Sequence, residues 1–562
     1  MALTADVVMT NGKFVTADER FSVASAVAIY RGRIVAIGDN DAVRSMAGAA
    51  TRSIDLKGQC VVPGQIDSFQ HYITSGLDMV QGRGTVNIIE LRSIEEILRR
   101  IKQRVDATPK GEWVETGCMF RGALKDGRWP NRWDLDQIAP DHPVYIRQGG
   151  RAIIANSQAL RLAGIQKDTP NPTEAPGVIV RDERSEATGQ LVAGAADMAR
   201  EVWSRLTGKP SWEWDFHHFG RDVLIDALLA QQRVNLACGI TAARDDATYP
   251  VEVGAWAEAR RRGLLKNRVG LLLAVPERHL WKKEERDRYF NSFFEPWELG
   301  DEWLWIAGVS SGYNLEGYQQ IDEAGMRDIV RECVRRDWTL AIAPSIGITQ
   351  SVDEVLTALE EVAEQIPSGR RHIMTHPNGL RRPADIERAR KLNLTISPTP
   401  LLYYYAAERS FRMHTSIQAA RLHSDTAADA WTQTVTMWGP RIKDWLEAGL
   451  VVSCGSVVPA ASLDIERPFL GQYCALTSET LAGVLLPDQA ITREQMVRLY
   501  TSHAAVALGK EREIGSLEVG KRADMAVLDR DILACPNAEI KEIKVLQTYV
   551  DGELVYERER GG

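Results

Sequence analysis

Short runs of apolar residues recur along most of this chain and are its most regular feature. Eight of them are rich in β-branched residues and nearly free of polar ones: CVVPGQID, GITAARD, VGLLLAV, WLWIAGVSS, TLAIAPS, HIMTH, LTISP and LVVSCGS. Strands that are buried on both faces have this near-continuous apolar pattern, which is typical of parallel sheets. The runs therefore predict a parallel sheet of eight buried strands.

Helical periodicity appears between several of these runs. The segments MRDIVRECVRRD and SVDEVLTALEEVAEQ, for example, carry apolar residues at helical spacing. Eight buried strands joined by helical crossovers predict an α/β fold of the (β/α)8 TIM-barrel type. In such barrels the chemistry takes place at the carboxyl ends of the strands, so the residues that follow each run are the candidates for a site.

Both ends of the chain show a different, alternating pattern. ADVVMTNGKFVT and ASAVAIYRGRIVAIG contain Asn-Gly and Arg-Gly pairs, and VLQTYVDGELVYE near the other end contains an Asp-Gly pair. Such pairs between apolar runs predict β-hairpins. Because chain termini commonly lie close together, we expect both ends to meet in one small β domain.

The first and second runs are separated by about 160 residues, far more than one crossover requires. This stretch includes HPVYIRQGGRAIIANSQALRLAGI, which has strand-like and helix-like parts of its own. We expect residues from about 80 to 209 to form a folded insertion over the mouth of the barrel.

Composition and charge restrict the possible partners. The 562 residues carry a formal net charge of -8, and this acidic balance disfavours a nucleic-acid partner. No run approaches the roughly 18 to 20 apolar residues of a membrane span, and the start MALTADVVMTNGKF does not look like a signal peptide. We therefore expect no membrane association and a cytoplasmic location. The seven cysteines are scattered without a C-x-x-C spacing, which favours buried thiols, Cys454 among them, over disulfides or a structural zinc site.

Specific phrases give the chain a family resemblance. VVPGQIDSFQH, ANSQALRLAGI, PGVIVRD, RHIMTH, VVSCGS and IGSLEVGKRADMAVLDRD together resemble the amidohydrolase superfamily, in the branch called amidohydrolase family 3. The resemblance implies a barrel over residues 61–514, with the insertion at about 80–209. It also implies a small β-sandwich built from residues 1–60 and 515–562. The implied activity is hydrolysis of C–N bonds in small molecules by a metal-activated water.

The metal ligands implied by this resemblance are mostly absent from the sequence. The strand-1 pair of histidines reads Phe69 and His71, and the strand-6 histidine is His376. The strand-4, strand-5 and strand-8 positions hold Ser310, Pro344 and Val457. Phe and Val cannot bind a metal, and two imidazoles alone make a weak site. We therefore expect no cofactor, although a weakly held zinc, iron or manganese ion on His71 and His376 stays open.

Two arginines stand where the resemblance implies histidines. They are Arg151, before the ANSQAL phrase, and Arg244, in GITAARDD. If both face the cavity, their guanidinium groups suit a carboxylate or a phosphate. A structural ion pair of Arg244 with the adjacent Asp245 or Asp246 is the alternative.

The remaining candidates for substrate binding are polar or line the expected pocket. Ser310, Tyr313 and Asn314 lie in and after the fourth run, while Phe69 and Val457 would shape the pocket wall. We expect a small-molecule substrate, anionic or carbonyl-bearing, and a homodimer or a higher homo-oligomer.

Three functions are compatible with these residues. The first is an enzyme in which His71 or His376 acts as general acid or base without the usual metal, by hydrolysis or by a lyase or isomerase step. The second is a conventional metal-dependent amidohydrolase with a non-standard site. The third is a non-catalytic binding or scaffold homologue.

Overall fold

A computed structural model gives the architecture. It describes residues 3–80, 86, 88, 91–119, 124–126, 128–147, 152–172, 177–207, 219–275, 283–292, 299–312, 321–344, 349–406, 439–457, 468–480 and 483–559. Eight parallel strands form its central sheet in the order β20-β19-β18-β17-β16-β15-β14-β8. They are β8 (Gln65–Gln70), β14 (Ile240–Thr248), β15 (Arg268–Ala274), β16 (Leu304–Gly312), β17 (Leu340–Ala343), β18 (Ile373–Thr375), β19 (Thr395–Ser397) and β20 (Val451–Val452). Each strand overlaps one of the eight predicted runs, which confirms the (β/α)8 barrel.

Backbone hydrogen bonds join the two edges of this sheet. The Ser68 amide donates to the Cys454 carbonyl at 3.3 Å, and the Val457 amide donates to the Phe69 carbonyl at 2.8 Å. The first strand therefore meets the segment that follows the last strand, and the sheet curls into a barrel.

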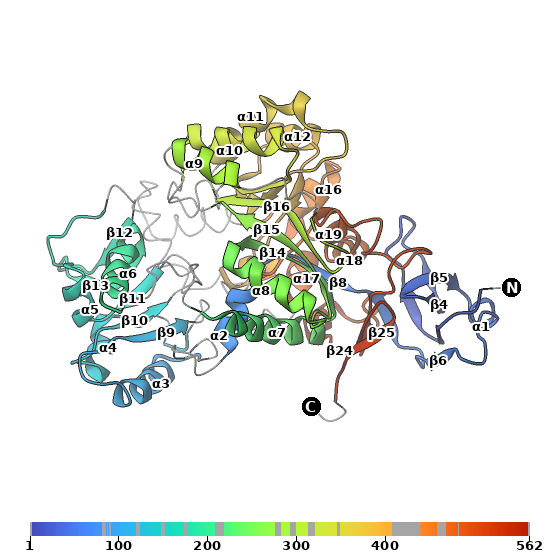
Figure 1. The fold of residues 1–562 in the computed structure, drawn as a ribbon, viewed down its shortest axis with the longest axis horizontal. Coiled ribbons are helices and arrows are strands. Elements are labelled where there is room, and N and C mark those ends of the chain that lie inside the picture. Colours follow the sequence, from blue (N-terminus) through green and yellow to red (C-terminus); the bar gives the residue numbers. More distant parts are fainter. Residues whose placement is uncertain are drawn as a thin grey trace.

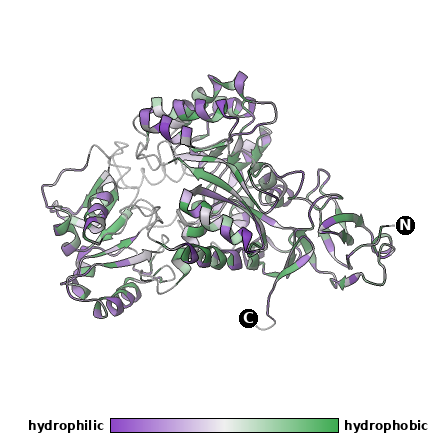
Figure 2. Cartoon of the chain, in the orientation of Figure 1, coloured by the Kyte–Doolittle hydropathy of each residue, from purple (hydrophilic) through white to green (hydrophobic). Residues whose placement is uncertain are grey.

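Amphipathic helices cover the barrel. They include α7 (Arg221–Ala237), α8 (Pro250–Arg261), α10 (Glu323–Arg335), α11 (Thr349–Glu360) and α12 (Pro383–Lys391). In α10 the buried residues Met326, Ile329, Val330 and Cys333 recur at helical spacing, and the side chain of Asp322 caps the helix by accepting from the Gly325 amide at 2.7 Å. Figure 2 shows hydrophilic and hydrophobic residues alternating along these helices, whereas the strands of the barrel are mostly hydrophobic.

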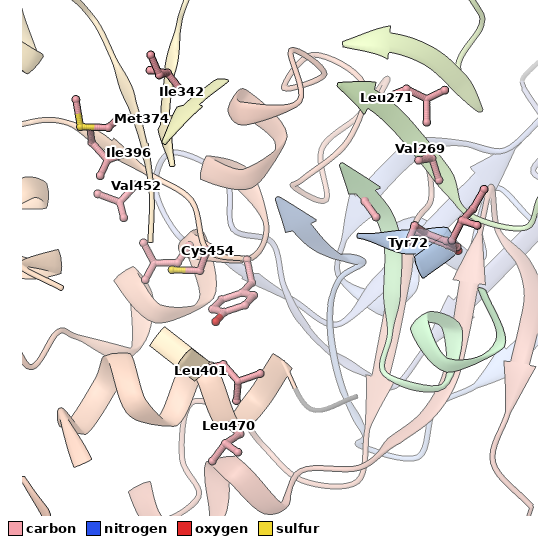
Figure 3. Close-up of a cluster of buried hydrophobic side chains, with 14 of the residues drawn as sticks. Tyr72, Val269, Leu271, Ile342, Met374, Ile396, Leu401, Val452, Cys454 and Leu470 are labelled. Carbon is pink, nitrogen blue, oxygen red and sulfur yellow. The ribbon is translucent and has the colours of Figure 1, made fainter. Parts of the chain in front are cut away.

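The core lies between these helices and the outer face of the barrel. In Figure 3 the side chains of Ile342, Met374, Ile396 and Val452, from β17, β18, β19 and β20, follow one another in strand order. Cys454 belongs to the same cluster, and burial raises the pKa of its thiol well above the usual value. Cys454 is a buried thiol, as expected, and its raised pKa disfavours the nucleophilic thiolate.

Both ends of the chain form a β-sandwich. One sheet has the order β5-β4-β1-β6 and the other β25-β24-β23-β7-β2-β3. The strands are β1 (Val7–Thr10), β2 (Lys13–Val15), β3 (Val23–Ala24), β4 (Ala26–Tyr30), β5 (Arg33–Gly38), β6 (Arg52–Asp55), β7 (Cys60–Pro63), β23 (Met525–Leu528), β24 (Val545–Val550) and β25 (Glu553–Glu557). The antiparallel pairing of β7 with β23 joins the two ends of the chain.

Two local predictions for this region were wrong. The Asn-Gly pair at Asn11 does not make a hairpin, because β1 and β2 lie in different sheets and Asn11, at φ 56°, carries the chain from one to the other. The predicted first strand, CVVPGQID, is two strands, β7 in the sandwich and β8 in the barrel. They are separated at Gly64, where a Cβ atom would lie 2.0 Å from Thr241 Oγ1. The Arg-Gly and Asp-Gly pairs do connect the hairpins β4–β5 and β24–β25.

The insertion has its own five-stranded sheet, in the order β12-β13-β11-β10-β9. Its elements include β9 (Val114–Cys118), β10 (Val144–Arg147), β11 (Ala152–Ala155), β12 (Gly177–Arg181), β13 (Ala187–Ala193), α3 (Ile94–Asp106) and α6 (Gly194–Thr207). Figure 1 shows it on the side of the barrel opposite the sandwich. Because β8 leaves the sandwich at its amino end, the carboxyl ends of the barrel strands point toward the insertion. Within the part of the chain that is described, no helix is long and apolar enough to cross a membrane.

Candidate active site

Three polar side chains reach the carboxyl end of the barrel from three strands. His71 directly follows β8, Ser310 lies near the end of β16, and His376 directly follows β18. Each is partly exposed, whereas the strand residues below them are buried. These are the accessible polar groups on which a reaction at this mouth would depend.

The ring of Phe69 contacts both histidines. Its ring centroid lies 5.4 Å from that of His71 and 5.0 Å from that of His376, with both rings meeting it edge to face. Val457 binds the Phe69 carbonyl through its amide, and its side chain is buried. The wall on this side of the mouth is therefore apolar.

Backbone strain accompanies these residues. Val457 has φ 53° and His376 has φ 47° and ψ 51°, both in the left-handed region. For a β-branched residue such as Val457 this conformation is costly, and such strain is concentrated at functional sites in folded proteins.

Asp246, at the end of β14, connects three of the candidate residues. Its backbone carbonyl lies 2.9 Å from His71 Nδ1, and its carboxylate accepts a hydrogen bond from the Ser310 hydroxyl. The same carboxylate lies 3.5 Å from Nη2 of Arg244. Asp246 therefore holds the imidazole, the hydroxyl and the guanidinium group in one arrangement.

The contact with Asp246 determines the tautomer of His71. A backbone carbonyl can only accept a hydrogen bond, so Nδ1 carries the proton and the lone pair of the neutral ring lies on Nε2. Burial lowers the pKa of His71 below its usual 6.5, even though the nearby Asp246 carboxylate opposes this. The imidazole is therefore neutral at pH 7 and can accept a proton on Nε2.

Arg244 and Asp245 point to opposite faces of β14. Arg244 is fully buried in the barrel interior, on the same face as Asp246. Asp245 faces outward and accepts from the Tyr72 amide and from Trp256 Nε1, each at 2.9 Å. Of the two ion pairs considered for Arg244, only the one with Asp246 forms.

A second carboxylate links the first and last strands. Asp67 accepts from the Ser456 hydroxyl at 2.6 Å and from the Ser456 amide at 3.0 Å. Burial raises the pKa of Asp67 to about 6 despite these hydrogen bonds, and burial likewise raises the pKa of Asp245 to about 7. Of the two carboxyl groups, Asp67 links the segments around the site, whereas Asp245 lies on the outer face of β14.

The raised pKa of Asp245 predicts a pH-dependent stability. The unfolded chain titrates near 3.9, so the stability from the protonated group is complete below that pH and is lost as the pH rises through about 7. Asp245→Asn loses a hydrogen bond but cannot ionise. We expect its melting temperature to lie below that of the wild type at pH 5 and to recover part of the difference by pH 8.

Differential scanning fluorimetry at constant ionic strength measures this difference. Asp301→Asn is the matched control, because hydrogen bonds from Arg260 and from backbone amides lower the pKa of Asp301 and keep it ionised throughout this range. The difference in melting temperature between Asp301→Asn and the wild type is expected to stay constant from pH 5 to pH 8. A constant deficit for Asp245→Asn as well would contradict the prediction.

The side chains at this mouth do not fit the divalent metal that the family resemblance implies. The apolar Phe69 ring packs against both imidazoles, and the Val457 side chain offers no ligand atom. Within the described ranges, no three His, Cys, Asp or Glu side chains are grouped as metal ligands.

The structure brings together six of the residues singled out from the sequence: Phe69, His71, Arg244, Ser310, His376 and Val457. Arg151, Tyr313 and Asn314 lie outside the described residues. Sequence reasoning treated Asp246 only as an ion-pair partner and did not consider Asp67. The inward position of Asp246 was predictable, because side chains alternate along a strand and Asp246 therefore lies on the same face of β14 as Arg244.

Comparison with known proteins agrees with this architecture. The profile of the amidohydrolase family matches residues 52–556. The chain is 27% identical to N-substituted formamide deformylase from Arthrobacter pascens over 99% of both chains, and 25% identical to the putative amidohydrolase YtcJ of Bacillus subtilis over 95% of this chain and 96% of the other.

Solved structures share the fold at lower identity. An uncharacterized metal-dependent hydrolase from Pyrococcus horikoshii superposes with a TM-score of 0.64 at 20% identity, covering 95% of this chain and 99% of the other. Atrazine chlorohydrolase TrzN from Arthrobacter aurescens, a zinc complex, has a TM-score of 0.55 at 15% identity, covering 98% and 95%.

Proposed function

From the premise that this chain belongs to the amidohydrolase family, in its family 3 branch, we propose that it hydrolyses a C–N bond of a small carbonyl-bearing molecule by acid-base chemistry, without the usual metal centre. Hydrolase relatives over nearly the full length support the hydrolytic reaction. The name of the Arthrobacter pascens relative suggests N-substituted formamides as the first substrates to test.

One observation carries the metal-free part of the proposal. His71 Nδ1 donates to the Asp246 carbonyl, so the basic nitrogen of the ring is Nε2, and the apolar ring of Phe69 packs against this imidazole. A neutral imidazole oriented in this way is a general base, which commonly contributes about 10²- to 10⁴-fold to a rate. In this proposal the side chain of His71 activates the water, and no metal ion is required for that step.

The proposed reaction is balanced with these residues alone. A water oxygen attacks the carbonyl carbon while His71 Nε2 takes one of its protons. The C–N bond then breaks, and the imidazolium returns this proton to the leaving nitrogen. The products are a carboxylate and a protonated amine, since the acid gives its proton to the amine at neutral pH.

The other residues would position the reactants. The Ser310 hydroxyl and the Asp246 carboxylate, joined by a hydrogen bond, offer an acceptor and a polar contact to water or substrate. His376 supplies a second imidazole across the Phe69 ring, as a further acid or as a hydrogen-bond donor to the developing oxyanion. Arg151 and Arg244 would bind an anionic group of the ligand.

Chelation of the purified full-length protein tests this proposal. After dialysis against EDTA and 1,10-phenanthroline, we expect the protein to retain most of its activity on a panel of N-substituted formamides and larger amides. Metal content measured by mass spectrometry on the same sample is the control. Near-stoichiometric zinc, iron or manganese that is lost together with activity would establish the metal-dependent alternative. Absence of turnover across the whole panel would favour a binding protein.

A further inference from the structure

Arg244 is a buried cation with unsatisfied hydrogen-bond donors. Its side chain is fully buried, and none of the described residues accepts a hydrogen bond from its Nε, Nη1 or Nη2 atoms. The nearest carboxylate, on Asp246, is 3.5 Å away and contributes charge but no hydrogen bond. A guanidinium group that is buried without acceptors is costly, so its place in the barrel interior requires an explanation.

Arg268, on the neighbouring strand β15, shows how this chain satisfies a structural arginine. Its Nε and Nη2 donate to the two carboxylate oxygens of Asp524 at 2.8 and 3.1 Å, and Nη2 also donates to Asp551 at 2.5 Å. Nη1 donates to the Glu302 carbonyl at 3.2 Å. Arg268 is nearly as deeply buried as Arg244 and has acceptors for all three nitrogens. With no acceptor among the described residues, the donors of Arg244 are available to a bound ligand.

Several small side chains share the interior face of the barrel with Arg244. Ile66, Ala242 and Ile373 belong to the cluster that fills the bottom of the barrel, so alternation directs Ser68, Arg244 and Thr375 inward one layer above it. Ser397 pairs with Thr375, and its hydroxyl lies 3.4 Å from that of Ser68. These positions place hydroxyl groups on the interior face that also carries Arg244.

We propose that Arg244 is the receptor for a small monocarboxylate, the acid that the reaction releases. A guanidinium fork matches the two oxygens of a carboxylate, and the hydroxyls of Ser68 and Ser397 suit its outer edges. The Asp246 carboxylate at 3.5 Å disfavours a second negative charge on the ligand, which selects formate or acetate over phosphate.

The position of Arg244 relative to the reaction agrees with a product site. Asp246 contacts His71 and Ser310 on the side of the mouth and Arg244 on the side of the interior. Hydrolysis of an amide converts the carbonyl into a carboxylate, so the fragment acquires a charge only when the C–N bond breaks. The biological meaning of this site rests on the proposed hydrolysis, but the binding itself does not.

Titration of the full-length protein with sodium formate and sodium acetate tests the assignment. We expect each to raise the melting temperature by a few degrees in a saturable manner, as a ligand specific for the folded state does. Sodium chloride at equal ionic strength, sodium phosphate and neutral acetamide are expected to produce no saturable shift. A shift with phosphate alone, or with none of these ligands, would overturn the proposal and leave water as the acceptor of Arg244.

Two variants assign the shift to Arg244. Arg244→Met is expected to abolish it. Asp246→Asn keeps the guanidinium group and removes the competing charge, so it is expected to bind acetate about tenfold more tightly. If Arg244→Met does not fold, the tighter binding by Asp246→Asn decides the question, and an unchanged affinity there would refute the assignment.

The outcome is independent of the proposed reaction. Carboxylate binding that depends on Arg244 in a protein that turns over no amide would uphold the site and reject the hydrolysis. Turnover without carboxylate binding, and without product inhibition by formate or acetate, would reject the site alone.

Discussion

His71→Ala is expected to lower kcat/KM by about 10²- to 10⁴-fold, because the variant lacks the proposed general base. The variant should keep the fold, since the imidazole is partly exposed and its hydrogen bond through Nδ1 goes to the backbone of Asp246. Steady-state kinetics on the best substrate of the amide panel measures the loss. The acidic limb of the wild-type pH profile, which lies below 6.5 because burial lowers the pKa of His71, is expected to disappear with it.

His503 provides a matched control for this experiment. Its Nδ1 also lies near a backbone carbonyl, that of Val452 at 3.2 Å, and burial lowers its pKa as well. It belongs to α19 (Ser502–Ala507), whose alanines pack at the bottom of the barrel, away from the mouth. His503→Ala is expected to keep kcat/KM and the pH profile. Equal losses of kcat/KM in both variants would mean that His71→Ala lowers activity only because it destabilises the fold.

If the reaction is metal-free as proposed, Phe69→His is expected to create a zinc site. The ring of Phe69 lies about as far from His71 as from His376, so an imidazole in its place would bring three nitrogen ligands together. Three protein ligands are sufficient for a catalytic-type zinc ion. We expect zinc affinity to rise by at least about 100-fold, since even changes to groups behind a metal ligand alter affinity by 10- to 100-fold.

Phe69→Leu is the control, because it removes the ring without adding a ligand. After gel filtration in zinc-free buffer, only Phe69→His should retain zinc close to one ion per chain. A wild-type protein that already retains one ion, or a Phe69→His protein that retains none, would show that the metal position has been misassigned.

Much of the fold was readable from local patterns. The eight barrel strands are buried on both faces, so each had to be a short apolar run, and the helices had to carry apolar residues at helical spacing. The hairpin predicted at the Asn-Gly pair of Asn11 was wrong, because the same turn residues can also connect strands that belong to two different sheets. Which of these occurs depends on partner strands that are far away in the sequence.

The candidate site was predictable only in part. His71 and His376 follow apolar runs, and the barrel rule places such residues at one end of the sheet. The roles of Asp246 and Asp67 depend on contacts with Ser310 and Ser456, which lie 64 and 389 residues away along the chain. No spacing in the sequence encodes those contacts.

The sequence alone specified the residue types at the strand ends, among them Phe69 and Val457, whose side chains have no atom that binds a metal. The tertiary structure alone decided the tautomer of His71, the inward direction of Arg244 and the different environments of Asp245 and Asp246. These properties arise from burial and from hydrogen bonds between strands, which exist only once the barrel has closed.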